Sequence, residues 1–241
     1  MTGAQQSGAR LVEPHAGGLA QRLNWLRAGV LGANDGIVST AAVVVGVAGA
    51  TAAVPPVFLA GAAALVGGAI SMALGEYVSV SSQRDGEKAL IEKERGELKV
   101  DPDGEFEELV GLYRAQGLQP DTARQVALEL TQHDALKAHL SIELNINQDD
   151  VVSPWHAALA SALAFTIGAV LPMLTILLLP HPVRIVWTFV AVLAALAVAG
   201  YTAAWIGGSS RWRAVVRTTI GGALALGATF LVGSLFGTGF G

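Results

Sequence analysis

Two acidic residues lie in otherwise apolar stretches of the sequence, where a carboxylate is unusual. Asp35 is the only charged residue between Ala28 and Gly75, and Glu76 follows directly after that interval. Placing a charged side chain in a bilayer costs roughly 2.5–3.5 kcal/mol on insertion scales, so such residues are functional candidates. Met72 lies four residues before Glu76 and shares a helical face with it. A carboxylate with a thioether suits a borderline-soft divalent metal such as Fe²⁺ better than Mg²⁺ or Ca²⁺.

Each of these residues also has a structural explanation. Asp35 stands between Asn34 and Gly36, where it can cap a helix or accept a hydrogen bond from a neighbouring helix. Glu76 is two helical turns from Arg84 and can extend toward the membrane interface. A single methionine in a span usually serves packing. The three residues therefore indicate a metal site only when taken together.

A second group of acids has a helical spacing. Two pairs of glutamates, three residues apart within each pair, occupy one helical face each: Glu94 with Glu97, and Glu105 with Glu108. Packed together across the turn Asp101–Gly104, the two faces would join four carboxylates, whose mutual repulsion demands a cation. The alternative is a solvated acidic face, with Lys93 and Arg95 lowering the local field.

The elements that must position these residues follow from composition. The chain has 241 residues, of which 52% are hydrophobic and 14% charged, against about 25% charged in an ordinary soluble domain. Charge-poor apolar stretches of about 20 residues predict membrane spans. The sequence therefore predicts an all-α membrane protein with five transmembrane helices: Leu26–Ala50, Val57–Ser82, Pro154–Leu179, Arg184–Ile206 and Ala214–Phe236. Pro55-Pro56 and Pro180-His181-Pro182 predict turns between spans.

A polar insert separates the second span from the third. It holds sixteen of the nineteen acids against eight bases. Three helices are expected in it: Arg84–Leu98 continuing span 2, Glu105–Gln116 ended by Gly117, and Pro120–Leu144 ended by Asn145. An apolar stripe of Val126, Leu130, Leu136 and Leu140 marks the third helix. The domain division is a flexible tail (1–22), spans 1–2 (23–83), the insert (84–153) and spans 3–5 (154–241).

Charge predicts the orientation. With the N-terminus inside, fourteen of the fifteen Lys and Arg residues lie on the inner side, and only Arg184 lies outside. Positive charge favours cytoplasmic loops, so the tail and the insert are predicted to be cytoplasmic and the C-terminus outside. Trp187, Trp205 and Trp212 lie near span ends, as interfacial aromatics do. The sequence has no Cys, which excludes disulfides and iron–sulfur clusters, and its net charge of −4 does not indicate nucleic-acid binding.

Two motifs resemble the vacuolar iron transporter family, in a bacterial-type member. They are Asn34-Asp35-Gly36-Ile37-Val38-Ser39 in span 1, and Ser71-Met72-Ala73-Leu74-Gly75-Glu76-Tyr77-Val78-Ser79 with Ser82-Gln83 in span 2. The resemblance extends over nearly the whole chain. It implies a homodimer that exchanges cytosolic Fe²⁺, and often Mn²⁺, for protons. It also implies that Asp35 and Met72 line the translocation site, and that the insert binds metal through Glu94, Glu97, Glu105, Glu108 and Glu143.

One position departs from the family pattern. His139-Leu140 stands where plant members have a methionine pair, so an imidazole replaces a thioether as a candidate ligand. The resulting hypothesis is an antiporter. Metal captured by the insert passes to a site made by Asp35, Met72 and Glu76, and protonation of these carboxylates releases it.

The alternative function is a membrane-anchored metal sensor that transports nothing. An enzyme is not expected, because His156 and His181 lie at opposite ends of span 3 and share no site with Asp35. No prosthetic group is expected either. The absence of a targeting segment favours a bacterial inner membrane, with a vacuolar membrane as the eukaryotic counterpart.

Overall fold

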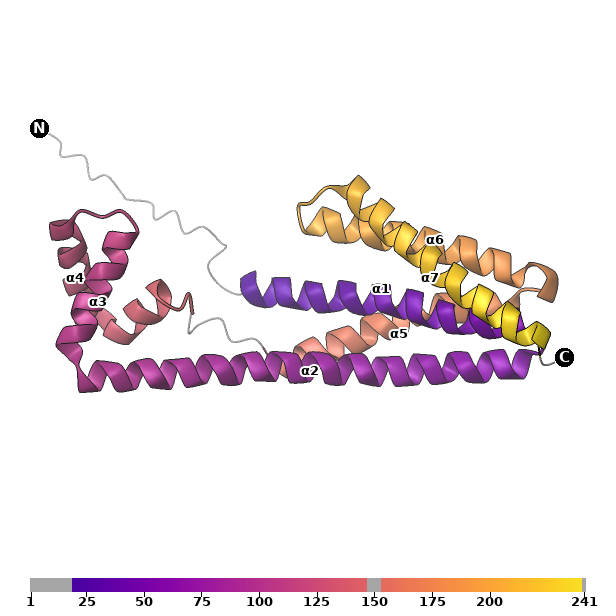
Figure 1. Ribbon diagram of the computed structural model, residues 1–241, viewed down its shortest axis with the longest axis horizontal. Helices are drawn as coiled ribbons and strands as arrows, with labels where there is room; N and C mark the ends of the chain where they lie inside the picture. Colours follow the sequence, from indigo (N-terminus) through magenta and orange to yellow (C-terminus); the bar gives the residue numbers. More distant parts are fainter. Residues whose placement is uncertain (1–18, 147–152, 240–241) are drawn as a thin grey trace, which may run out of the picture. The chain divides into compact units, whose positions relative to one another are not determined.

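The computed structural model describes residues 19–146 and 153–239, and its regular structure in these ranges is entirely α-helical (Figure 1). Seven helices occur in these ranges: α1 (Leu19–Ala50), α2 (Val54–Val100), α3 (Pro102–Ala115), α4 (Pro120–Ile142), α5 (Pro154–Leu178), α6 (His181–Ile206) and α7 (Arg211–Gly239). Five of them, α1, α2, α5, α6 and α7, are long and apolar enough to cross a membrane. The predicted all-helical fold with five spans is therefore confirmed.

Most of the prolines between spans lie in the first turn of a helix rather than in a turn before it. Pro55 and Pro56 belong to the first turn of α2, and Pro182 belongs to the first turn of α6. The first backbone N–H groups of a helix have no partner within it, so a proline loses nothing there and its fixed φ favours the helix. The predicted turn at Pro55-Pro56 is therefore wrong, since both prolines begin α2, whereas Pro180 precedes α6 as its N-cap and lies in the predicted short turn.

Helix α2 is a single helix of 47 residues, as the sequence predicted for span 2 and its continuation. By contacts the chain divides into two compact units. We call the described residues 83–146 the insert unit, and the described residues 24–82 with 153–239 the membrane unit. The first part of α2 belongs to the membrane unit and the remainder to the insert unit.

Capping residues define the helices of the insert unit. Asp101 Oδ1 accepts a hydrogen bond from the Gly104 backbone N–H at 3.0 Å, which caps α3. Gly117 has a φ of 100° after the end of α3, a backbone conformation that favours glycine. The predicted stop at Gly117 is thus confirmed. The helix begins at Pro102 rather than at Glu105, because the Asp101 cap comes before the predicted start.

Helix α4 differs from its prediction in its core face. Leu109 and Val110 of α3 pack against Ala123, Ala127 and Ala138 of α4. Small alanine side chains, rather than the predicted Val/Leu stripe, therefore form most of this contact, because they allow two helices to approach closely. Of the predicted stripe, Leu130 joins this core, Leu140 is buried elsewhere, and Val126 and Leu136 are partly buried.

The end of α4 also differs from its prediction. The helix ends at Ile142 rather than Leu144, and Asn145 follows with a φ of 51°. Ile146 N–H then donates to the Leu140 carbonyl at 2.8 Å. Asparagine in the left-handed backbone conformation often follows the end of a helix. The sequence predicted this role for Asn145. Asp134 interrupts the helix with non-helical angles, φ −164° and ψ 94°.

In the membrane unit α1 packs closely against its neighbours. A methyl group on Gly36 would lie 2.1 Å from the Phe165 carbonyl oxygen of α5, and one on Gly233 of α7 would lie 1.8 Å from the Gly46 carbonyl oxygen. Ile37 packs against Val192 and Leu196 of α6. Glycines at such crossings let backbones touch, as is typical of helix packing in membranes.

Arg184 is buried although charge counting placed it on the outer side. It begins α6 with only 2% of its surface exposed, and its Nη2 donates to the Thr51 carbonyl at 3.1 Å. Thr51 directly follows α1, where carbonyl groups without helical partners attract a cation. Arg184 therefore ties the start of α6 to the end of α1.

Candidate metal centre

Three helices of the insert unit bring acidic and imidazole side chains to one point. Glu94 comes from α2, Glu105 from the first turn of α3 and His139 from the last turn of α4. One ligand atom from each lies within 4.8 Å of the others, and among the described residues this is the one such group of His, Cys, Asp or Glu side chains. Glu94 is 3% exposed and His139 1%, whereas Glu105 is partly buried.

His139 Nδ1 lies at the centre of the group. It is 3.0 Å from Glu94 Oε1, 3.7 Å from Glu105 Oε2 and 3.9 Å from Glu143 Oε2. The shortest contact does not have hydrogen-bonding geometry. Glu94 Oε1 and both ring nitrogens of His139 are buried without a hydrogen-bond partner among the described residues. An unsatisfied buried polar group costs about 1–3 kcal/mol. A cation between the carboxylates and the imidazole would satisfy Glu94 Oε1 and His139 Nδ1, so the donor set fits a divalent metal.

The charges in this cluster act together on Glu94. Burial is the main cause that raises the pKa of Glu94 to about 7. Four further carboxylates raise it by repulsion: Glu143, Glu105, Glu97 and Glu108. Burial also raises the pKa of Glu105, with Glu108 as the next cause, while His139 acts in the opposite direction. Glu97, Glu108 and Glu143 thus act on the buried Glu94 by charge, while the close group of ligand atoms consists of Glu94, Glu105 and His139.

A lysine lies at the rim of this cluster. Lys93 Nζ is 2.8 Å from Glu97 Oε2, and its pKa is raised by Glu97 and, to a smaller extent, by Glu143 and Glu94. A cleft of about 380 Å³ opens beside the pair, lined by Lys93, Gly96, Glu97, Val100, Asp101 and Glu105. Sequence reasoning named Lys93 only as a neighbour that lowers the local field. The signal for its pairing is its spacing of four residues from Glu97.

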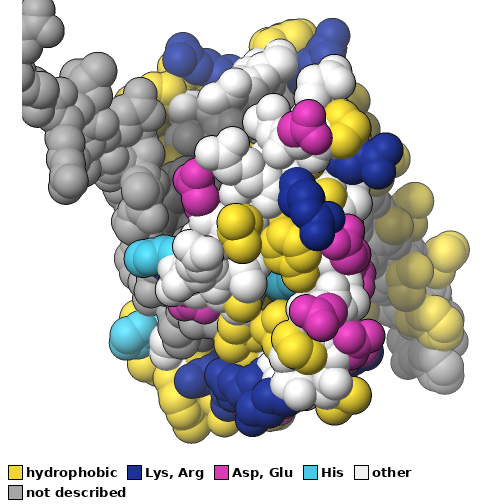
Figure 2. Space-filling model, turned by 90° about the vertical axis from the view of Figure 1, so that its left-hand side faces the viewer, with side chains coloured by type: hydrophobic (Ala, Val, Ile, Leu, Met, Phe, Trp, Pro, Cys, Tyr) yellow, Lys and Arg dark blue, Asp and Glu magenta, His cyan; other side chains and the backbone are white. Residues whose placement is uncertain are grey.

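The exposed acids of the insert unit have a different environment. Figure 2 shows acidic and basic side chains interspersed over this face. Glu92 pairs with Arg95, and Glu107 pairs with Arg124. The solvated acidic face considered for the two spaced pairs of glutamates does not describe the buried Glu94, whereas Glu108 is exposed.

The candidate ligands of the membrane unit are arranged differently. Asp35 is partly buried and accepts a hydrogen bond from the Ser39 hydroxyl one turn later. Met72 is partly buried on α2. Asp35 and Glu76 belong to no group of three acidic or imidazole side chains among the described residues. A single copy of the chain therefore offers two carboxylates on two helices rather than a clustered ligand set.

Glu76 already has a cationic partner. It is 8% exposed, and its Oε1 is 3.1 Å from Arg27 Nη2. Sequence reasoning missed this pair and considered Arg84 as the nearby base. Arg27 stands 49 residues before Glu76, so the pair depends on how α1 and α2 pack.

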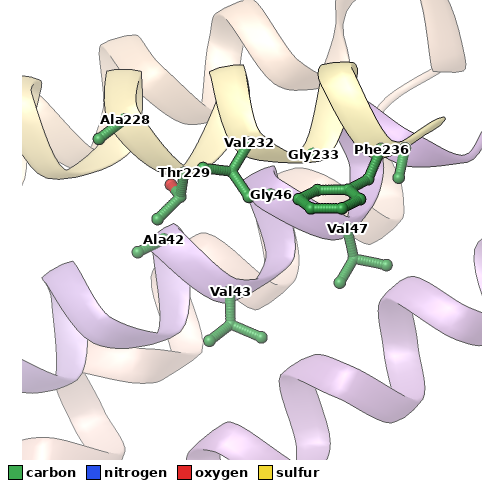
Figure 3. Close-up of a pocket in the computed structure, with 10 residues that line it drawn as sticks. Ala42, Val43, Gly46, Val47, Ala228, Thr229, Val232, Gly233 and Phe236 are labelled. Carbon is green, nitrogen blue, oxygen red and sulfur yellow. The ribbon is translucent and has the colours of Figure 1, made fainter. Parts of the chain in front are cut away.

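The membrane unit has a groove between α1 and α7 (Figure 3). Its volume is about 490 Å³, and its lining is entirely apolar at the accessible surface. The α1 side is formed by Ala42, Val43, Gly46, Val47 and Ala50. Thr229 is the one polar residue in the lining, and its hydroxyl donates to carbonyls of its own helix. The groove therefore holds no metal ligand.

Comparison with known proteins finds matches along most of the chain. The model of the VIT family matches residues 26–234. A protein of Acanthamoeba castellanii named "Vacuolar iron transporter" is 43% identical over 212 residues, which cover 88% of this chain and 78% of that protein. "Vacuolar iron transporter homolog 2.1" of Arabidopsis thaliana is 36% identical over 211 residues, with 87% and 80% covered. "Vacuolar iron transporter homolog 1" of Oryza sativa subsp. japonica is 37% identical over 217 residues, with 90% and 75% covered.

Proposed function

Because this chain belongs to the VIT family, we propose that it transports divalent metal, Fe²⁺ and also Mn²⁺, out of the cytosol in exchange for protons. The names of its relatives support iron as the cargo. The observation that carries the proposal is the buried pair of Glu94 and His139, in which Glu94 Oε1 and both ring nitrogens have no hydrogen-bond partner among the described residues. A binding site for a cation explains why these atoms are held together away from water.

The insert unit is the loading site in this proposal. Glu94, Glu105 and His139 provide the inner ligands, and a rim of carboxylates attracts the ion: Glu97, Glu108 and Glu143. Carboxylate oxygen and imidazole nitrogen are good ligands for Fe²⁺ and Mn²⁺. Because no thioether belongs to this centre, we expect it to accept Mn²⁺ readily.

The membrane unit provides the translocation site. Asp35 and Met72 are the proposed ligands, with Glu76 as a third group that Arg27 holds while no metal is bound. Protonation from the outer side weakens metal binding, because only the deprotonated carboxylate is a good ligand. Competition between metal and protons for the same oxygens then couples the two flows.

A homodimer completes this site in the proposal. The span of α2 has an exposed apolar face that includes Val66, Ile70, Leu74 and Val78. Gly67 and Gly75 of the same helix have no neighbouring atom within 4 Å of an added methyl group. Small residues beside apolar ones favour helix association in a bilayer. This face supports pairing with a second copy, which would bring a second set of Asp35 and Met72 to the site.

The proposed topology places the N-terminus and the insert in the cytoplasm and the C-terminus outside. In a bacterium this is the inner membrane, and in a eukaryote the vacuolar membrane. The proposed domains remain the tail (1–22), spans 1–2 (23–83), the metal-binding insert (84–153) and spans 3–5 (154–241). The metal is cargo, and the proposal includes no enzymatic step, no prosthetic group and no nucleic acid.

The test is metal flux into proteoliposomes that contain the full chain. We expect a proton gradient across the vesicle membrane to change the flux of Fe²⁺ and Mn²⁺. Asp35→Ala should abolish this flux. His139→Ala should weaken metal binding and slow the flux at low metal concentration. Asp35→Ala should still bind metal through the insert. Normal flux through Asp35→Ala would contradict the membrane site. Metal binding without any flux in the unaltered protein would favour the membrane-anchored sensor instead.

A further inference from the structure

Helix α4 consists of two helical segments that meet at Asp134. The backbone of Asp134 is extended, with φ −164° and ψ 94°, while the residues on both sides are helical. The Lys137 N–H donates to Asp134 Oδ1 at 3.0 Å. A side chain that accepts from the N–H three residues later is the geometry of a helix N-cap. Asp134 therefore ends the segment 120–133 and begins the segment 135–142.

The second segment carries the imidazole of the metal centre. Ala138 and Ile142 of this segment pack with the core formed by Leu109 and Val110 of α3. His139 follows Ala138 directly and lies with its Nδ1 3.0 Å from Glu94 Oε1. Successive helical residues point about 100° apart, so the first residue of a segment sets the direction of every side chain after it. The position of the break therefore decides whether His139 faces Glu94.

We propose that Asp134 is a positioning residue for the metal centre: its cap starts the segment 135–142 and thereby aims His139 and Glu143 at Glu94 and Glu105. This inference rests on the proposed metal-loading function of the insert. Asp134 acts through His139 and is not itself a ligand in the inference. Its contribution is the hydrogen bond to the Lys137 N–H, not its negative charge.

Substitutions separate the cap from the charge. Asn accepts the same hydrogen bond without a charge, and Ala accepts none. Glu keeps the charge but places its carboxylate one methylene group farther away and is not a favoured N-cap residue. Asp121 is the matched control, because it is an acid in the first turn of the same helix and its helix has no side-chain cap hydrogen bond.

The experiment is a titration of the full-length protein in detergent with Mn²⁺, with free Mn²⁺ measured by electron paramagnetic resonance. We expect Asp134→Ala to raise the dissociation constant for Mn²⁺ by ~5-fold, which corresponds to the loss of one helix cap. We expect Asp134→Asn and Asp121→Ala to bind like the unaltered protein. Absorption of bound Co²⁺ should also change in Asp134→Ala and not in Asp134→Asn, because the ligand geometry changes.

Two outcomes would overturn the inference. One is unaltered Mn²⁺ affinity in Asp134→Ala, and the other is equal loss in Asp134→Asn and Asp134→Ala, which would assign the effect to charge. If Asp134→Ala does not fold, Asp134→Asn and Asp134→Glu decide: the inference expects Asn to bind normally and Glu to bind weakly, and it fails if the order is reversed. Absence of Mn²⁺ binding in the unaltered protein would instead contradict the proposed function.

Discussion

Glu92 and Glu94 are two residues apart in α2 and have different environments. Glu92 pairs with Arg95 at the surface, while Glu94 is buried beside His139. Burial and neighbouring carboxylates raise the pKa of Glu94 to about 7. Without metal, Glu94 is therefore protonated in the folded protein below a pH of about 7, and a bound cation favours the carboxylate form.

This environment predicts a pH dependence of stability. Since the folded pKa is raised from 4.5 to about 7, the stabilising contribution is full below pH 4.5 and is lost as the pH rises through about 7. The loss amounts to roughly 3 kcal/mol. Glu94→Gln should remove this part of the pH dependence, so the metal-free variant should be more stable than the unaltered protein at pH 8. Thermal unfolding in detergent with a chelator, measured between pH 5 and 8, provides the check.

The same carboxylate predicts how metal affinity depends on pH. Mn²⁺ affinity should fall by up to tenfold per pH unit below about 7, because one proton competes with the metal. Glu94→Gln should bind metal weakly at every pH. Glu92→Gln is the control, and it should retain both the metal affinity and the pH dependence of stability of the unaltered protein. A metal-free Glu94→Gln variant with the same pH profile as the unaltered protein would contradict the raised pKa.

At the scale of elements, α1 lies against α5 and α7 at backbone distance. The crossing with α7 depends on Gly233, because a methyl group there would lie 1.8 Å from the Gly46 carbonyl oxygen. Neither backbone can give way as a flexible side chain would. The helices would have to separate, which removes packing along the whole crossing.

Gly233→Ala should therefore destabilise the membrane unit by roughly 1–3 kcal/mol, as overpacking does in other well-packed interiors. Gly227 is the matched control in the same helix, since nothing lies within 4 Å of a methyl group placed there. Gly227→Ala should be neutral or slightly stabilising, because alanine favours helix more than glycine does. Thermal unfolding of both variants in the same detergent compares them. Equal unfolding temperatures for the two would argue against a close α1–α7 crossing.

At the scale of the whole molecule, the proposed orientation rests on the distribution of basic residues. Positive charge favours the cytoplasmic side, and Arg184, the single exception, is buried against the end of α1 instead of lying in a loop. The chain contains no cysteine, so a single introduced thiol reports on one position without interference.

Gln116→Cys in the insert unit and His181→Cys at the start of α6 should react on opposite sides of the membrane. A membrane-impermeant maleimide added to intact cells should label His181→Cys, and should label Gln116→Cys only after permeabilisation. Both positions are exposed, so accessibility within the protein does not limit the reaction. Labelling in the reverse pattern would contradict the cytoplasmic insert and the direction of transport.

The helical spans could be predicted from the sequence alone, and so could a short set of candidate ligands. A bilayer requires about 20 apolar residues per span, so the ends of α1 and α5 could be predicted closely from residues such as Ala50 and Pro154. Residues close together in the sequence were also enough to predict that α2 continues beyond the span and that Gly117 follows the end of α3. A spacing of three residues showed that Glu94 and Glu97 share a face.

Which glutamate of a pair is buried, and which residues it contacts, depends on how the helices pack and could not be predicted from the spacing. Glu94 lies inside because α3 and α4 cover its side of α2, whereas Glu97 lies at the rim beside Lys93. The central place of His139 depends on a break at Asp134, and the partner of Glu76 is Arg27 from another helix. The contacts of Glu94 with His139 and of Glu76 with Arg27 join residues far apart in the chain. Helical periodicity describes the faces of one helix, and the packing of several helices selects which face becomes a site.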